Sequence, residues 1–133
     1  MSWLKSSGNC YNTDSFFAVH GGPDDYLEQY MYAPTFPIGI SQNLFLCGHT
    51  HIQVYLNENG KQFCNPGSVG QPRDSDPKAA FAILHSNKTI ENRRVEYNIQ
   101  ETAAACKDAG YDSRFYSGLF SGEPIKSMKG SVS

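Results

Sequence analysis

Two short apolar runs in the first half of the chain each lead into a loop that contains glycine and histidine. Residues 15–19 precede His20-Gly21-Gly22-Pro23, and residues 43–47 precede Gly48-His49-Thr50-His51. Apolar runs of this length, bounded by glycine and proline, predict buried strands. The pattern therefore predicts two strands that break into glycine loops, where their ends present histidine side chains.

Alternating runs later in the chain predict two hairpins. The first covers residues 52–65 and turns at 57–60, where the sequence Asn-Glu-Asn-Gly favours a tight turn. The second covers residues 79–97 and turns at 86–89. Between them, residues 65–74 lack periodicity and are rich in Gly, Pro, Ser and Asn, which predicts an irregular loop.

A short helix is predicted after the first glycine loop, over residues 25–33. Asp24 or Asp25 would cap it, and apolar side chains follow at helical spacing. Its N-terminus would face the His20 loop and favour an anion there, because the helix dipole places partial positive charge at that end. An ordinary capped surface helix is the competing interpretation.

Helical patterns return near the end of the chain. Asn98 followed by Glu101 resembles a capping box, and Gly110 is a natural stop for the helix that it begins. Residues 112–119 predict a second short helix. Strands first and helices last indicate an α/β, α+β-like fold, a partial β-sandwich with flanking helices, in which at least one sheet edge is open.

Composition limits the classes of function. The chain has 133 residues and a formal net charge of -2, without a large basic block, so we expect no broad nucleic-acid surface. No apolar run approaches the roughly 20 residues that span a bilayer, and no signal peptide is evident, so we expect no membrane association and a cytoplasmic protein. The four cysteines form no C-x-x-C pair, which argues against a thiolate zinc site. Cys47 and Cys64 lie in strand-like runs and are expected to be buried thiols.

Three of the four histidines, His20, His49 and His51, lie where strands end. Neutral imidazole binds Zn, Mn, Fe, Ni or Cu, and three imidazoles plus a water complete the shell of a mononuclear catalytic zinc ion. The loop at 65–74 exposes backbone N–H groups to an oxyanion, and Arg73 adds a charged, bidentate donor for phosphate. A purely structural crossover is the alternative interpretation of that loop.

Taken together, three motifs in series resemble the calcineurin-like metallophosphoesterases, especially their small bacterial and archaeal phosphodiesterase branch. The motifs are His20-Gly21-Gly22-Pro23, Cys47-Gly48-His49-Thr50-His51 and the run from Asn65 to Asp74. The resemblance covers the second half of that domain. The D-x-H, G-D and G-N-H-[DE] motifs of the first half are not found. Gly8-Asn9-Cys10 lacks the histidine of the last one and lies close to His20.

The resemblance implies a phosphoesterase with two divalent ions, Mn, Zn, Fe or Ni, bridged by an aspartate. His20 and His49 match ligands of one ion, and His51 matches a ligand of the other. Gly21, Asn65, Ser68 and Arg73 are candidate contacts to a small phosphate ester, a phosphodiester or phosphomonoester. The catalytic acid is not identified, since it belongs to the missing motifs. The resemblance therefore implies an enzyme, and the missing ligand motifs leave the activity of the isolated chain open.

The resemblance also implies a division of the chain. Residues 1–14 are expected to be irregular, 15–121 to form the C-terminal half of the phosphoesterase domain, and 122–133 to be a disordered tail. A second chain, or the missing N-terminal half, is expected to pair across the open sheet edge. Two alternatives remain: a non-catalytic scaffold module of the same superfamily, and a mononuclear hydrolase with three histidine ligands.

Overall fold

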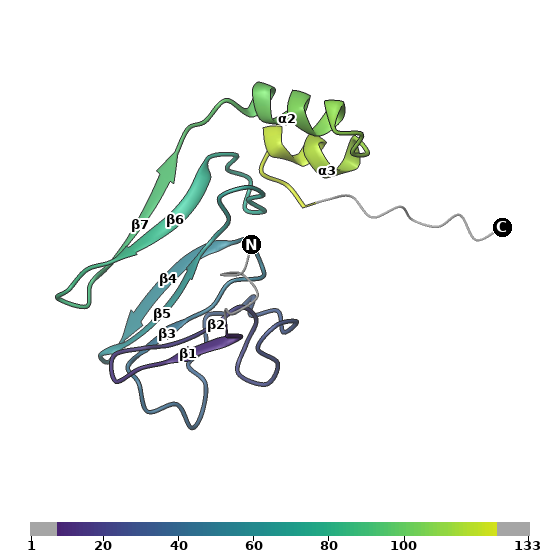
Figure 1. The fold of residues 1–133 in the computed structure, drawn as a ribbon. Coiled ribbons are helices and arrows are strands. Elements are labelled where there is room, and N and C mark those ends of the chain that lie inside the picture. Colours follow the sequence, from purple (N-terminus) through teal and green to yellow (C-terminus); the bar gives the residue numbers. More distant parts are fainter. Residues whose placement is uncertain (1–7, 125–133) are drawn as a thin grey trace.

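The computed structural model describes residues 8–124, which form two sheets with helices beyond one end (Figure 1). The larger sheet has the strand order β1-β2-β3-β5-β4, and β6 and β7 form a two-stranded sheet. This arrangement confirms the mixed α/β class. No helix in the described part is long and apolar enough to cross a membrane. The elements are β1 (Cys10–Asn12), β2 (Phe17–Val19), β3 (Leu44–Leu46), β4 (Gln53–Glu58), β5 (Lys61–Pro66), β6 (Ala79–Leu84), β7 (Ile90–Val95), α2 (Ile99–Asp108), α3 (Arg114–Ser117) and the 3-10 turn η1 (Gly118–Phe120).

Three neighbouring strands of the larger sheet run parallel. β2 pairs with β3, and β3 pairs with β5, both in parallel register, while β1 and β4 flank them in antiparallel register. The carboxyl ends of parallel strands lie at the same edge of a sheet, which is where α/β proteins commonly bind ligands. Consequently, the loops that follow β2, β3 and β5 begin at one edge, and these are the three loops singled out in the sequence.

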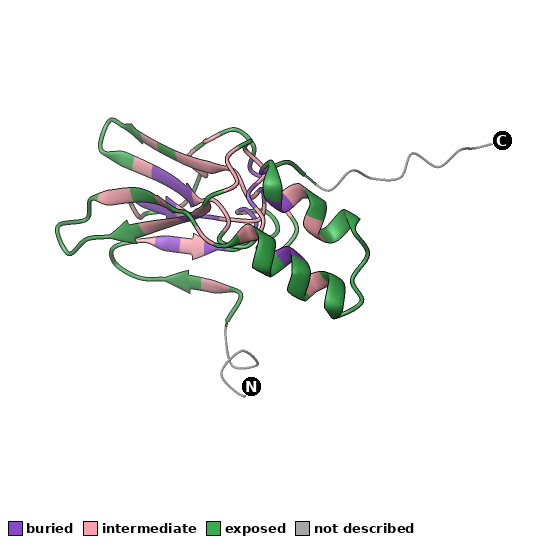
Figure 2. Cartoon of the chain, turned by 90° about the horizontal axis from the view of Figure 1, so that it is seen from above, coloured by how far each residue is buried: buried purple, intermediate pink, exposed green. Residues whose placement is uncertain are grey.

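Phenylalanine rings on the parallel strands form the centre of the core. Phe17, Phe45 and Phe63 come from β2, β3 and β5. The ring centroids of Phe17 and Phe45 lie 6.0 Å apart, and those of Phe45 and Phe63 lie 5.8 Å apart. Phe63 is 0% exposed and Phe45 is 1% exposed. Figure 2 shows the buried residues concentrated in the strands, whereas most of the helical surface is exposed. The core thus fixes the strand ends that carry the candidate site.

Both predicted hairpins are confirmed. β4 and β5 are joined by Asn59 and Gly60, whose φ angles of 52° and 80° are both positive. This is the geometry of the tight turn that Asn-Gly favours, because it matches the twist of the strands. β6 and β7 pair from Ala79 opposite Val95 to Leu84 opposite Ile90.

The late helical region also matches its prediction. The Asn98 side chain accepts a hydrogen bond from the N–H of Glu101 and caps α2, and Gly110 follows the helix with φ of 81°. The N–H of Tyr111 donates to the carbonyl of Cys106, which closes the last turn around that glycine. The predicted helix at 112–119 is present as α3 and η1.

The helix predicted over residues 25–33 is wrong, because the structure has only a turn at 26–28 there. The Asp25 carboxylate accepts from the N–H groups of Leu27 and Glu28, and the Gln29 side chain binds the backbone of Asp24. These local bonds replace the helical ones, and a helix this short gains little by itself. The anion site predicted at the N-terminus of this helix is therefore wrong as well.

The two terminal segments differ in part from their predictions. The stretch expected to be irregular contains β1, which pairs with β2 at the edge of the sheet. At the other end, Gly122 is buried, and its carbonyl accepts from the N–H of Ser75, so the expected tail does not begin there. Residues 1–7 and 125–133 lie outside the described part of the chain.

Candidate metal centre

The loops after β2 and β3 are tied together by a backbone hydrogen bond. The N–H of Gly48 donates to the carbonyl of His20 over 2.8 Å. A Cβ atom at position 48 would lie 3.4 Å from that carbonyl oxygen, at the lower limit of ordinary van der Waals contact. The backbone hydrogen bond therefore holds the two histidine loops side by side.

His20 and His49 face each other across this junction. Nε2 of His20 lies 3.0 Å from Nδ1 of His49, and the ring centroids are 4.9 Å apart. Two nitrogens that each bind one ion at about 2.1 Å, at a right angle, are about 3.0 Å apart. The separation fits both a hydrogen bond between the rings and two ligands of one ion.

The other nitrogen of His49 gives a further constraint. His49 Nε2 is buried and has no hydrogen-bond partner among the described residues. Tyr30 packs beside this ring, with centroids 4.1 Å apart. A buried ring nitrogen without a partner is costly in either protonation state, so the pair is not fully satisfied by its own hydrogen bond.

His51 is held in one tautomer. Its Nδ1 lies 2.8 Å from the carbonyl oxygen of Gln71, and a carbonyl only accepts, so Nδ1 carries the proton. Burial, together with the nearby charge of Arg73, lowers the pKa of His51 despite this bond, which favours the neutral ring. Nε2 of the neutral ring then has a free lone pair, the arrangement found in histidine ligands whose other nitrogen is bonded to a carbonyl.

The backbone of the histidine loop is unusual at both histidines. His49 has φ of 64° and His51 has φ of 61°, in the left-handed region that side-chain-bearing residues rarely adopt. Such a conformation persists where its surroundings impose it, and these outliers cluster at functional sites. Thr50, the residue between the two histidines, is buried and 3% exposed.

Asn65, at the end of β5, holds this loop in place through side-chain hydrogen bonds. Its side chain is 0% exposed and donates to the carbonyl of Gly48 over 2.8 Å and to Oγ1 of Thr50 over 2.9 Å. Its amide oxygen accepts from the N–H of Gly67 at 3.0 Å. Asn65 is therefore a positioning residue for the His49 loop, and its contact with a substrate stays a prediction.

The remaining candidate substrate contacts are engaged within the protein. The N–H of Gly21 donates to the carbonyl of Tyr26, and Oγ of Ser68 accepts from the N–H of Gln71. Arg73 binds the Gln71 side chain at 3.3 Å, and its Nε is buried with no partner in the described part. Among these residues, Arg73 lies near His51, and its charge helps to lower the pKa of His51. Substrate contact by Gly21, Ser68 and Arg73 stays a prediction.

Asn9 is a residue that the sequence analysis set aside. It lines a hollow of about 290 Å³ together with His20 and Leu27, next to β1. The signal was present in the sequence as Gly8-Asn9-Cys10, but the short spacing to His20 argued against it. Antiparallel pairing of β1 with β2 explains how a residue so near in sequence lies beside the strand end.

The described residues do not make up a complete metal shell. They contain no group of three or more His, Cys, Asp or Glu side chains placed to hold a metal ion. Burial raises the pKa of the Cys47 thiol to about 12 and of the Cys64 thiol to about 11, so both stay protonated and are poor ligands. The separation of His20 Nε2 and His49 Nδ1 fits two positions of one shell, and His51 offers a third nitrogen.

Comparison with known proteins assigns the family. Residues 8–89 match the calcineurin-like phosphoesterase superfamily domain. The chain belongs to this superfamily. An uncharacterized protein of Methanocaldococcus jannaschii, MJ0912, is 39% identical over an alignment that covers 44% of this chain and 31% of that protein.

Two solved structures share the fold. A metallophosphoesterase from Sphaerobacter thermophilus superposes with a TM-score of 0.79 at 29% identity, over 91% of this chain and 62% of that one. The hypothetical protein PH1004 from Pyrococcus horikoshii has a TM-score of 0.75 at 18% identity, over 91% of this chain and 53% of that one. The chain thus spans less than two thirds of the length of each of these relatives.

Proposed function

We propose that the chain is the metal-binding C-terminal half of a metal-dependent phosphoesterase. The substrate class is a small phosphodiester or phosphomonoester, and the place of action is the cytoplasm. The observation that carries the proposal is the 3.0 Å approach of His20 Nε2 to His49 Nδ1 at the strand ends, in a chain of this superfamily.

His20 and His49 would hold one divalent ion, Mn, Zn, Fe or Ni, and His51 would contribute Nε2 to a second. Bound divalent ions neutralise charge on phosphoryl oxygens and activate the attacking water. The chain's own residues prepare the ligands: the Gln71 carbonyl fixes the tautomer of His51, and Asn65 holds the His49 loop. Asn9, which lines the same hollow as His20, would add an amide oxygen, a ligand type that suits hard cations.

The direct experiment measures metal stoichiometry and affinity for the wild-type chain and for single histidine variants. His20→Ala and His49→Ala are expected to weaken the same site, whereas His51→Ala weakens a different one. His85→Ala is the matched control, because His85 lies on the β6–β7 hairpin with Glu91 as its partner. Equal loss of one site in all three variants would contradict the two-ion assignment.

A mononuclear hydrolase with three histidine ligands is the second candidate. It gains support from the presence of all three imidazoles at one sheet edge, and it predicts a single ion whose binding all three alanine variants abolish. The non-catalytic scaffold predicts no specific metal binding, even though the histidines are retained. Metal binding by the chain, lost on His20→Ala or His49→Ala, therefore separates the proposed function from the scaffold.

A further inference from the structure

Two tyrosine rings form an exposed stack beside the candidate metal centre. The rings of Tyr30 and Tyr32 are nearly parallel, with an interplanar angle of 11° and centroids 5.4 Å apart. The two residues are 46% and 67% exposed. Aromatic side chains that lie together at the surface, rather than singly, commonly mark a place where something binds.

The backbone explains why both rings lie on one side of the chain. In a helix, side chains two positions apart would point in nearly opposite directions. The structure has neither helix nor turn from 29 to 32, and Met31, between the two tyrosines, is 9% exposed and packs in the core with Phe17 and Phe45. Because Met31 anchors the segment, Tyr30 and Tyr32 are held on its outer side before any ligand binds.

The stack begins at the metal centre and extends away from it. The ring centroids of Tyr30 and His49 are 4.1 Å apart, and those of Tyr30 and Tyr32 are 5.4 Å apart, so Tyr32 lies no farther from His49 than these two distances combined. Covalent bonds of about 1.5 Å let a pentose hold a phosphate and a nucleobase roughly 6 Å apart. One nucleotide can therefore place its phosphate at an ion on His49 and its base on Tyr32.

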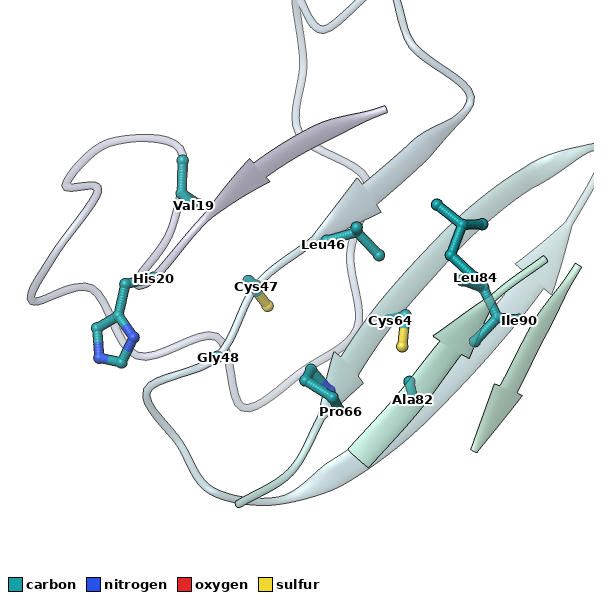
Figure 3. Close-up of a pocket in the computed structure, with 10 residues that line it drawn as sticks. All are labelled: Val19, His20, Leu46, Cys47, Gly48, Cys64, Pro66, Ala82, Leu84 and Ile90. Carbon is teal, nitrogen blue, oxygen red and sulfur yellow. The ribbon is translucent and has the colours of Figure 1, made fainter. Parts of the chain in front are cut away.

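The hollow next to His20 offers no comparable surface. It has a volume of about 310 Å³ and lies between the two sheets, and Figure 3 shows the His20 ring at one end of it, beyond Cys47 and Gly48. Apart from His20, none of the side chains that line this hollow is aromatic. A planar group would find no ring to stack on there, so the tyrosine stack is the favoured place for it.

Charge narrows the class of ligand. Asp24, Asp25 and Glu28 are exposed in the loop that leads into the tyrosine stack. Their carboxylates repel a second phosphate, so a neutral planar group fits this side of the centre better than a polyphosphate chain does. Every nucleobase has a flat face of this kind, and stacking on aromatic side chains tolerates any base.

We propose that Tyr32, supported by Tyr30, stacks on the nucleobase of a nucleoside phosphate ester whose phosphate is bound at the histidine centre. This inference rests on the proposed function for the position of the phosphate, and it names a nucleotide as the substrate class. Tyr32 is a binding residue for the base and takes no part in holding metal. Tyr30 fixes the stack against His49.

The first experiment compares two probes that differ by the base. Adenosine 5′-monophosphate (AMP) and ribose 5-phosphate are each titrated into the whole chain, and nuclear magnetic resonance follows the tyrosine rings. We expect AMP to shift the Tyr32 ring resonances and ribose 5-phosphate to leave them unchanged. Tyr111, which is 61% exposed, serves as the internal control and should respond to neither probe. Equal shifts of Tyr32 with both probes, or none with AMP, would overturn the proposal.

Variants at Tyr32 separate stacking from general apolar contact. Tyr32→Ala and Tyr32→Leu are expected to weaken AMP binding about fivefold or more, whereas Tyr32→Trp retains it, because the indole ring still stacks. Tyr111→Ala is the matched control and should bind AMP as wild type does. AMP binding by Tyr32→Leu as tight as by Tyr32→Trp would contradict stacking. Tyr32 is chosen over Tyr30 because Tyr30 contacts His49, and the comparison of probes on wild type decides the matter if a variant misfolds.

Each titration is made with Zn²⁺ and again with EDTA, which separates this inference from the proposed function. We expect Zn²⁺ to tighten AMP binding. If no zinc binds at His20 and His49 but AMP still shifts Tyr32 in EDTA, the base-stacking site stands and the phosphoesterase assignment fails. If zinc binds there and both probes bind equally without affecting Tyr32, the phosphoesterase assignment stands and the base-stacking site fails.

Discussion

Asn65→Asp is the substitution that tests most sharply how the histidine loop is held. The change keeps the size of the side chain but removes its two N–H donors, which now reach the Gly48 carbonyl at 2.8 Å and Thr50 Oγ1 at 2.9 Å. The position is 0% exposed, so water cannot replace them. An ionised carboxylate would face the Gly48 carbonyl without a hydrogen between them, whereas the Thr50 hydroxyl can turn and donate to it.

The magnitude follows from two routes. If the new carboxyl stays ionised, the Gly48 carbonyl and the carboxylate oxygen that faces it both lack a donor, at about 1–3 kcal/mol each. If it takes up a proton, one donor is restored, but protonation at pH 7 costs about 4 kcal/mol, since the ordinary pKa is near 3.9. The less costly route decides the outcome, so the free energy of unfolding falls by about 2–4 kcal/mol at pH 7.

The assay is urea denaturation at pH 7 and pH 5, with Asn57→Asp as the matched control. Asn57 is exposed on β4, and its amide makes only a 3.4 Å contact to Tyr55, so the control should change stability by about 0.5 kcal/mol or less. The penalty at position 65 should shrink at pH 5, because protonation becomes cheaper. A loss equal to that of the control at both pH values would refute the bracing role.

Other regions give further predictions. Asp74 is partly buried, which alone would raise its pKa, but hydrogen bonds from the Arg94 side chain and the N–H of Gln53 lower it overall. Its contribution to stability is therefore fully present above the unfolded pKa of about 3.9 and is lost as the pH falls through the lower folded pKa, so the urea midpoints of Asp74→Asn and wild type should differ at pH 7 and converge as the pH falls below that folded pKa. Gly60→Ala should destabilise by about 1–2 kcal/mol through its φ of 80° alone, because a Cβ there meets no other atom. Gly70→Ala, equally open but without a positive φ, should cost less than half as much in thermal denaturation, and equal losses would contradict this account.

Strands and turns were predictable because their signals are local. Asn59 and Gly60 specify a tight turn by their own backbone preferences, and Asn98 and Glu101 specify a helix start without reference to the rest of the chain. The helix predicted over 25–33 failed because a local competitor was stronger. The carboxylate of Asp25 accepts from two nearby N–H groups and closes a turn before a helix can form.

The histidines of the candidate site were predictable, but their geometry was not. The glycine loops marked His20, His49 and His51, whereas the parallel pairing that brings the first two together joins strands far apart in the sequence. The same holds for Asn65, whose buried bracing role depends on a loop 15 residues or more away. Short β1 was missed because three residues with an exposed face carry little periodic signal.

Titration with Mn²⁺, followed by nuclear magnetic resonance of the histidine rings, tests the central claim most directly. The four imidazoles serve as one another's controls in a single sample, and paramagnetic broadening also detects weak binding by an incomplete shell. We expect substoichiometric Mn²⁺ to broaden His20 and His49 first and His51 next, with His85 unaffected. Broadening of His85 to the same extent as His20 and His49, or no broadening of that pair, would contradict the assignment of a metal centre to this chain.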